Sequence, residues 1–231
     1  MLNVNNLSVS YPDGTEVLRG VSFTLKRREN AALIGANGAG KTSLLLSLSG
    51  ILGISGGNAD ACGVALGKQT LGEYRRSIGL VFQNPDDQLF MPSIFEDIAF
   101  GPRNLGVPEA EIAPLVQRTL ESLGIAHLSA RSPLKLSGGE KRLCALATTL
   151  AMEPEFLLLD EPTAFLDPKA RHNLAGLLNR LPQGKLIATH DLSFARLTCS
   201  RVLLLSDGEV SDRGAPTEAT LSALERELVG N

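Results

Sequence analysis

Residues 35–42 carry the residue types that bind a nucleotide. They fit the pattern G-x-x-x-x-G-K-[ST], in which glycines let backbone N–H groups curl around phosphate oxygens. Lys41 is placed to reach the β- and γ-phosphates, and the Thr42 hydroxyl is placed to ligate Mg²⁺. We call residues 35–42 the phosphate loop. The residues predicted to contact nucleotide here are Gly35, Asn37, Gly38, Gly40, Lys41, Thr42 and Ser43.

The segments on either side of the phosphate loop support this interpretation. Residues 31–34 form a short apolar stretch that predicts a buried strand, and residues 43–52 have a helical pattern. A strand, a glycine-rich turn and a helix follow one another, so the helix N-terminus adds positive potential at the phosphates. The alternative is a chance glycine-rich turn, which this order disfavours.

Two carboxylates follow a second apolar stretch, residues 156–159. Ligands of open α/β sheets lie beyond the carboxyl ends of the strands, so both acids should lie beside the phosphates. We predict Asp160 as the second anchor of Mg²⁺ and Glu161 as the general base that polarises the attacking water. The alternative is that both are solvated loop acids after a core strand.

The rest of the chain predicts an α/β fold. Residues 2–34 indicate strands joined by turns, and Asp207-Gly208 is a hairpin signal. Helical patterns dominate from about residue 86 to 151, with a further short helix near the end of the chain. The expected strands are residues 21–25, 31–34, 78–82, 156–159, 185–189 and 202–205, and the clearest helices are 43–52, 112–123, 143–150 and 217–228.

Composition narrows the classes of function. The net charge of −3 disfavours a nucleic-acid partner. The three cysteines and three histidines lie far apart and match no metal or disulfide spacing, so we expect reduced thiols in the cytosol. The N-terminus lacks a signal-peptide pattern, and no apolar stretch approaches the roughly 18 residues of a membrane span. Any membrane role must therefore pass through a partner.

The stretch Leu136-Ser137-Gly138-Gly139-Glu140 resembles the signature of ATP-binding-cassette (ABC) ATPases. Glu140 is a mild departure, because the family more often has Gln there. Ser137 and the amides of the two glycines at a helix N-terminus would form a second anion site. The alternative is that Ser137 has a structural role only and caps the start of a helix that binds no ligand.

The ABC resemblance covers essentially the whole chain and implies its fold. That fold is a phosphate-loop (RecA-like) core with a mainly parallel sheet, an N-terminal antiparallel β subdomain and an inserted α-helical signature subdomain. We therefore expect one domain over residues 1–231, with the helical subdomain at about 86–151.

The resemblance also assigns roles to single residues. Gln83 matches the Q-loop glutamine, which senses Mg²⁺ and the attacking water. His190 matches the switch histidine at the γ-phosphate, and Asp167 matches the D-loop that crosses the dimer interface. Tyr11 matches the aromatic residue that stacks on adenine. A structural histidine and a turn tyrosine packed on the sheet are the alternatives for His190 and Tyr11.

Residues 81–90, which we call the Q-loop segment, resemble the same region of energy-coupling-factor (ECF) transporter ATPases. In that family an acidic pair, here Asp86 and Asp87, meets an arginine of the membrane scaffold subunit. The alternative is that both acids only stabilise a helix start after Asn84-Pro85.

The ECF resemblance implies a head-to-tail homodimer that binds ATP and Mg²⁺ between each phosphate loop and the partner's signature. It implies a peripheral protein on the cytoplasmic face of the cell membrane, which energises import of cobalt or nickel ions or of a vitamin such as biotin. A substrate-binding membrane subunit would be contacted indirectly. Three classes remain as rivals: the ATPase of a conventional ABC transporter, a soluble ABC ATPase, and more remotely a phosphate-loop kinase.

Overall fold

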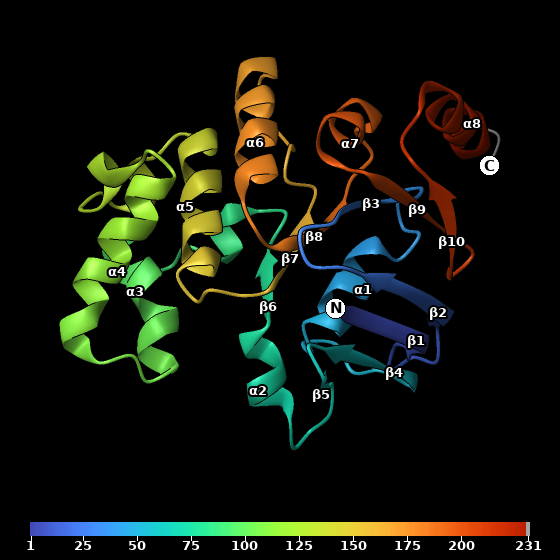
Figure 1. Ribbon diagram of the computed structural model, residues 1–231, viewed down its shortest axis with the longest axis horizontal. Helices are drawn as coiled ribbons and strands as arrows, with labels where there is room; N and C mark the ends of the chain where they lie inside the picture. Colours follow the sequence, from blue (N-terminus) through green and yellow to red (C-terminus); the bar gives the residue numbers. More distant parts are fainter. Residues whose placement is uncertain (230–231) are drawn as a thin grey trace.

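The larger sheet of this computed structural model, which describes residues 1–229, has the strand order β10-β9-β3-β8-β7-β6 (Figure 1). Neighbouring strands from β6 to β9 run parallel, and β10 pairs antiparallel with β9. Parallel strands bury both faces, which explains why the sequence shows them as continuous apolar stretches. The strands are β3 (Asn30–Ile34), β6 (Ile78–Val81), β7 (Phe156–Asp160), β8 (Gly184–Ala188), β9 (Arg201–Ser206) and β10 (Glu209–Gly214).

Alternate side chains of this sheet enter two different cores. On β3, Ala31 and Leu33 pack into one core, while Ala32 and Ile34 pack into the other. Because successive side chains of a strand point to opposite faces of the sheet, each strand contributes side chains to both cores. We call the core that contains Ala32 and Ile34 the first core; it includes helices of the upper layer in Figure 1. The second core contains Ala31 and Leu33 and includes the smaller sheet.

The smaller sheet is antiparallel, in the order β2-β1-β4-β5. It packs with helix α1 against the face of the larger sheet opposite α6 (Figure 1). The bounds are β1 (Leu2–Ser10), β2 (Glu16–Leu25), β4 (Gly56–Ala61) and β5 (Val64–Ala65), with α1 over Lys41–Leu48 and α2 over Leu71–Arg76.

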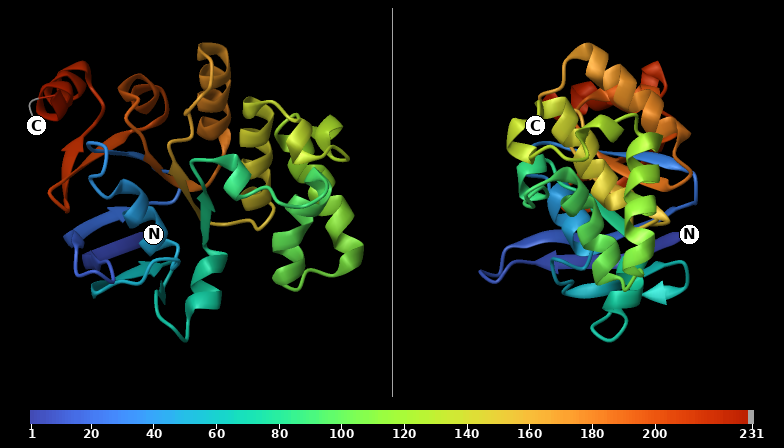
Figure 2. Two further views of the ribbon diagram at one scale, coloured as in Figure 1. Left: turned by 180° about the vertical axis from the view of Figure 1, so that it is seen from behind. Right: turned by 90° about the vertical axis from the view of Figure 1, so that its left-hand side faces the viewer.

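One end of the molecule is helical and lies beyond β6, the edge strand of the larger sheet (Figures 1 and 2). Its apolar faces join the first core, which ties it to the sheet. The helices are α3 (Ile94–Asn104), α4 (Glu109–Ser122) and α5 (Gly138–Leu150), with 3₁₀ turns η1 (Pro85–Asp87), η2 (Ala126–Leu128) and η3 (Pro133–Lys135).

Three further helices cover the other face of the larger sheet: α6 (Pro168–Arg180), α7 (Leu192–Thr198) and α8 (Glu218–Val229). Leu174 and Leu178 of α6, Phe194 of α7 and Leu224 of α8 are buried in the first core. No helix among residues 1–229 combines the length and apolarity that a membrane crossing needs.

The structure confirms the predicted strands and the α/β fold class, with a mostly parallel sheet and an N-terminal antiparallel sheet. The helix predicted over residues 43–52 is wrong at both ends, because α1 begins at Lys41 and ends at Leu48. Gly50 has φ +72° and the N–H of Ile51 bonds back to the carbonyl of Leu46, which is a helix-ending turn. Two predicted strands extend one residue too far. The strand predicted over 78–82 ends at Val81, because the Phe82 N–H donates to the Gln88 side chain. The strand predicted over 185–189 is β8, which begins at Gly184 and ends at Ala188.

Candidate functional site

The phosphate loop leaves the carboxyl end of β3 and continues into α1. Gly38 and Gly40 have φ of +81° and +101°, a backbone region that favours glycine. A Cβ on Gly40 would lie 2.9 Å from Cγ1 of Val17, so the second sheet also presses on the loop. Only glycine therefore fits Gly40 in this conformation.

Lys41 is buried inside this loop. Its Nζ donates to the carbonyl oxygens of Gly35 at 2.7 Å and Ala36 at 3.1 Å. Burial lowers the pKa of Lys41, and the nearby carboxylates Glu161 and Asp160 oppose that shift. The loop thus surrounds the positively charged ammonium group of Lys41. A positive charge in this position is suited to binding a polyanion.

The oxygens expected to hold Mg²⁺ lie together. Thr42 Oγ1 donates to Oδ2 of Asp160 at 2.7 Å, joining the start of α1 to the end of β7. Burial raises the pKa of Asp160, while the hydrogen bond from Thr42 opposes the shift. A hydroxyl and a carboxylate are the oxygen donors that Mg²⁺ prefers, so the pair fits that ion. Gln83 is exposed just past the end of β6, the strand that pairs with β7.

Glu161 and His190 come together from the ends of β7 and β8. His190 Nδ1 lies 3.0 Å from Glu161 Oε2, and the His190 backbone N–H lies 3.4 Å from the same oxygen. Glu161 is buried and sits at φ +42°, whereas the His190 side chain is 69% exposed. The backbone thus holds Glu161 in a fixed position while His190 faces solvent. Their roles as base and switch histidine stay predictions.

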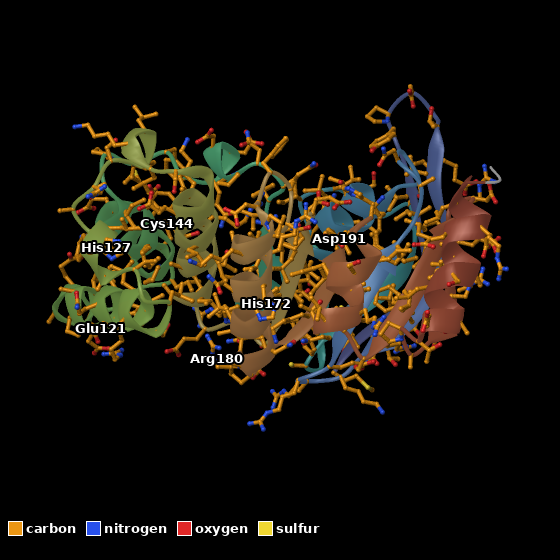
Figure 3. The ribbon with its side chains drawn as sticks, turned by 90° about the horizontal axis from the view of Figure 1, so that it is seen from above. Glu121, His127, Cys144, His172, Arg180 and Asp191 are labelled. Atoms are coloured by element: carbon orange, nitrogen blue, oxygen red, sulfur yellow. The ribbon has the colours of Figure 1, made fainter. Side chains whose placement is uncertain are left out.

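The next residue, Asp191, fixes the loop that carries His190. Its carboxylate accepts the Phe194 N–H at 2.9 Å, which caps α7, and bonds Arg171 Nη1 of α6 at 3.0 Å. Figure 3 labels Asp191 close to the α6 and α7 region, with His127 far away in the helical end. No motif in the sequence indicates that Asp191 connects α6 to α7 through these two contacts.

The residues of the predicted signature begin helix α5. The Ser137 hydroxyl accepts the N–H of Glu140, and the Glu140 carboxylate accepts from the Ser137 N–H at 2.8 Å and hydroxyl at 2.7 Å. These bonds from Ser137 lower the pKa of Glu140. Ser137 therefore caps the start of α5, which agrees with the structural alternative. Ser137 and the neighbouring Gly138 are also exposed to solvent. Among the hydrogen bonds of residues 1–229, none joins residues 136–140 to the phosphate loop.

Tyr11 and Asp167 border this region. Tyr11 Oη lies 2.7 Å from Ser43 Oγ, so its partly exposed ring stands beside the phosphate loop. Asp167 is exposed and caps α6 by accepting the Ala170 N–H at 2.8 Å. Both positions suit the roles that the resemblance implies, and those roles remain predictions.

The profile described as "ABC transporter" matches residues 18–164. This chain belongs to the ABC transporter family. It is 47% identical over its full length to a Geobacter sulfurreducens protein, across 89% of that protein, whose name as an ABC transporter ATP-binding protein is provisional. It is 44% identical to an energy-coupling factor transporter ATP-binding protein of Methanothermobacter thermautotrophicus, covering 94% of this chain and 72% of that one.

Two solved structures share the fold of this ABC ATPase. One is cbiO1 of Clostridium perfringens, titled part of the ABC transporter complex cbiONQ, with a TM-score of 0.85 and 37% identity over 99% of this chain and 92% of that one. The other is a dimeric bacterial ABC transporter cassette, with a TM-score of 0.79 and 25% identity over 91% and 97%. The chain is thus an ATP-binding, ATP-hydrolysing subunit of the kind found in ABC transporters.

The Q-loop segment of this ABC ATPase is tied to α5 by contacts that the sequence did not predict. Lys141 Nζ lies 2.6 Å from Asp86 Oδ1, and Arg142 Nη1 donates to the Phe82 carbonyl at 3.0 Å. The Gln88 amide donates to the carbonyl of Ala145 at 2.8 Å. Lys141 and Arg142 follow the signature directly, but nothing in their types or spacing points to the Q-loop segment.

The acidic pair in the Q-loop segment has a mixed environment. The Asn84 side chain accepts the Asp86 N–H at 3.2 Å and its amide donates to Asp87 Oδ1 at 3.2 Å, so Asn84 caps η1. Both carboxylates remain exposed. The acids therefore belong to a helix start and still face outward.

Proposed function

We propose that this ABC ATPase binds ATP and Mg²⁺ between its phosphate loop and the signature of a second copy. Residues 35–43 and Asp160 would hold one face of the nucleotide, with Glu161 as base and His190 and Gln83 at the γ-phosphate. Ser137, Gly138 and Gly139 of the partner would complete the charge-stabilising shell. The observation that carries this proposal is the Glu161–His190 contact of 3.0 Å beside the Thr42–Asp160 hydrogen bond of 2.7 Å. These contacts bring the residues predicted as base, switch residue and metal ligands together at the carboxyl ends of the strands.

The dimer follows from the separation of the two predicted anion sites within one chain. Residues 136–140 share no hydrogen bond with the phosphate loop among residues 1–229, so one chain alone would leave half of the phosphate shell open. A dimeric cassette exists among the similar structures. Closure on ATP and reopening after hydrolysis would move the helical region, about residues 86–151, against the rest of the domain.

We further propose that the partner driven by this motion is a membrane scaffold subunit of an ECF-type importer. An apolar groove of about 570 Å³ lies beside the Q-loop segment, between α3, α5 and the end of β6. Phe90 and Phe100 line it edge to face, with ring centroids 5.2 Å apart, and remain 63% and 42% exposed. The same Q-loop segment carries the exposed carboxylates of Asp86 and Asp87. Exposed aromatic rings and acidic side chains in one region suit a helix that carries an arginine between apolar residues.

Similarity to an ECF transporter ATPase and to cbiO1 supports an importer of the ECF type. The proposed cargo, a cobalt or nickel ion or a vitamin such as biotin, rests on the resemblance of the sequence to that family. The protein would then act at the cytoplasmic face of the membrane and touch the substrate-binding subunit only indirectly. The ATPase of a conventional ABC transporter is the second candidate, since the family profile alone fits it equally well.

The test is affinity purification of the tagged chain from detergent-solubilised host membranes, with mass spectrometry of the proteins that accompany it. A scaffold subunit with a small substrate-binding membrane protein supports the ECF assignment, and a conventional permease pair contradicts it. The variant Asp86→Lys/Asp87→Lys should lose the membrane partners. A matched control, Glu209→Lys/Glu225→Lys, makes the same change of charge at exposed positions of β10 and α8 and should keep them.

A further inference from the structure

A cavity of about 550 Å³ lies between α4, α5 and α6, and we call it the interhelical cavity. It shares no lining residue with the groove beside the Q-loop segment. Its volume is within the range of small-molecule binding sites. One side belongs to the helical end of the molecule and the other to α6, which lies beside α5 in Figures 1 and 2. The apolar part of its wall consists of Leu123, Leu143, Leu166, Leu174 and Leu177.

Arg142 lines the interhelical cavity and is only 3% exposed. Its Nη1 donates to the Phe82 carbonyl at 3.0 Å, but its Nε is buried and has no hydrogen-bond partner among residues 1–229. Burial lowers the pKa of Arg142 and the Asp160 carboxylate opposes that shift, although a guanidinium stays charged in proteins. A buried charge with an unpaired donor is unfavourable, so an added acceptor would relieve that cost.

The charged groups around the cavity favour an anion. Figure 3 labels Arg180 at the end of α6 and Glu121 near the end of α4, and both line the cavity and are exposed. Glu121 Oε1 already accepts from Nε2 of Gln117 at 2.6 Å. Arg180 forms no ion pair within residues 1–229. Two guanidinium groups and one carboxylate therefore border the apolar wall, which leaves an excess of positive charge.

We propose that the interhelical cavity binds a small amphipathic carboxylate, with its anionic group at Arg142 and its apolar body against the leucines. A guanidinium is a planar fork of N–H donors, so a carboxylate pairs with it more strongly than a neutral acceptor does. Because Nε is itself buried, the carboxylate would reach it through a small rotation of the Arg142 side chain. This binding does not depend on the proposed dimer.

A ligand in this cavity would act on the parts that the proposed function sets in motion. Gly139 of the signature lines the cavity, and Arg142 holds the Phe82 carbonyl next to Gln83. A carboxylate that contacts α5 and α6 at once favours the arrangement of these helices described here. Since the proposed function requires the helical region to move against the rest of the domain, the bound carboxylate should slow ATP hydrolysis.

The test uses octanoate as the probe and isothermal titration calorimetry of the full chain without nucleotide. We expect saturable binding of one octanoate per chain. 1-Octanol has the same chain length without the charge, and it should bind about tenfold more weakly or worse. Arg142→Gln removes the charge and Ala170→Phe fills the cavity from α6, so each should weaken octanoate binding about tenfold or more.

Two control variants locate the site. Ala110→Phe makes the same change at an exposed position of α4 outside the cavity and should bind octanoate as the wild type does. Lys41→Ala removes the ammonium group of the phosphate loop and should also keep octanoate binding, because that loop is a separate anion site. Saturating octanoate should lower the ATPase rate of the wild type about twofold or more, and should not affect the rate of Ala170→Phe.

The outcomes separate this proposal from the proposed function. A chain that shows no saturable octanoate binding, or binds 1-octanol equally well, would overturn the site. Unchanged binding by Ala170→Phe would do so too, and this variant decides the matter if Arg142→Gln does not fold. Octanoate binding with an unchanged ATPase rate would overturn the effect on α5. Because the titration contains no ATP, a failure of the proposed dimer would leave the binding result intact.

Discussion

Lys141 Nζ lies 2.6 Å from Asp86 Oδ1, and this ion pair joins the signature helix α5 to the Q-loop segment. The Lys141 side chain is only 19% exposed, although Asp86 is 56% exposed. The pair therefore interacts more strongly than two fully solvated charges would. A force that a bound partner exerts on Asp86 would therefore be transmitted to α5, the helix that Ser137 caps.

This ion pair predicts a measurable coupling energy. In a double-mutant cycle of Asp86→Asn and Lys141→Met, urea unfolding should give a coupling of about 0.5–1 kcal/mol, and high salt should reduce it. Strictly additive single and double variants would show that the two side chains do not interact in solution. Arg19 and Glu16, paired at 3.2 Å with both side chains about half exposed, provide a reference pair for which we expect a smaller coupling.

Glu161→Gln should abolish turnover and retain nucleotide binding. The amide keeps the shape of the side chain but cannot accept a proton from water, so we expect the ATPase rate to fall about 100-fold or more. ATP should then hold the dimer closed, which size-exclusion chromatography with light scattering can measure. Lys41→Ala is the control that should lose binding itself. Wild-type turnover by Glu161→Gln would remove Glu161 from the role of base.

Glu140→Gln should tighten the ATP dimer. Gln can still accept the Ser137 N–H, so the capping box survives and Tm should change by less than about 2 °C. Removing a carboxylate beside a site for the partner's γ-phosphate removes like-charge repulsion. In the Glu161→Gln background we expect the dimer dissociation constant to fall about 3- to 10-fold. An unchanged or weaker dimer would place Glu140 away from the phosphates.

The helices and strands that could be predicted are those whose own residue pattern favours the structure, without contacts from distant parts of the chain. Residues 156–159 are apolar without interruption because β7 is buried on both faces, and that pattern identifies the strand at once. In contrast, β4 has the sequence Gly-Gly-Asn-Ala-Asp-Ala, which predicts no strand. Its strand exists because it pairs with β1, and the paired residues range from Leu2 and Ala61, 59 positions apart, to Ser8 and Gly56, 48 positions apart.

The candidate site shows the same division. The phosphate loop and the pair Asp160-Glu161 each consist of residues close together in the chain. Their types and spacing are therefore enough to predict them from the sequence. The bonds of Arg142 to the Phe82 carbonyl and of Lys141 to Asp86 depend on how α5 packs beside the Q-loop segment. The left-handed backbone of Phe165, φ +63°, is likewise not predictable from the sequence, because nothing in the residue types of that loop requires a positive φ at a phenylalanine.

Lys185 predicts a pH dependence of stability. It is buried at the start of β8, where Nζ donates to the carbonyls of Leu181 at 2.9 Å and Gln183 at 2.7 Å near the end of α6. Burial lowers the pKa of Lys185 to about 8 from an ordinary value of 10.5. The unfolded chain therefore binds more protons than the folded chain between these values, and the free energy of unfolding should rise with pH in that window.

Burial raises the pKa of the Cys199 thiol to about 11 and that of the Cys144 thiol to about 12, both from an ordinary value of 9, so the two thiols oppose this trend as soon as they begin to ionise in the unfolded chain, above about pH 8. Lys185→Met keeps both thiols, so the difference in pH dependence between the wild type and this variant isolates the lysine. Between pH 8 and 9, the free energy of unfolding measured with urea should rise by roughly 0.5–1 kcal/mol more for the wild type than for Lys185→Met. Lys185→Met should also be less stable overall, because it loses the two hydrogen bonds to carbonyl groups and a third, from Nζ to Asn30 Oδ1 at 3.2 Å. Lys68→Met, at an exposed position, should keep the wild-type slope. An equal slope in Lys185→Met would show that Lys185 does not change its proton affinity on folding.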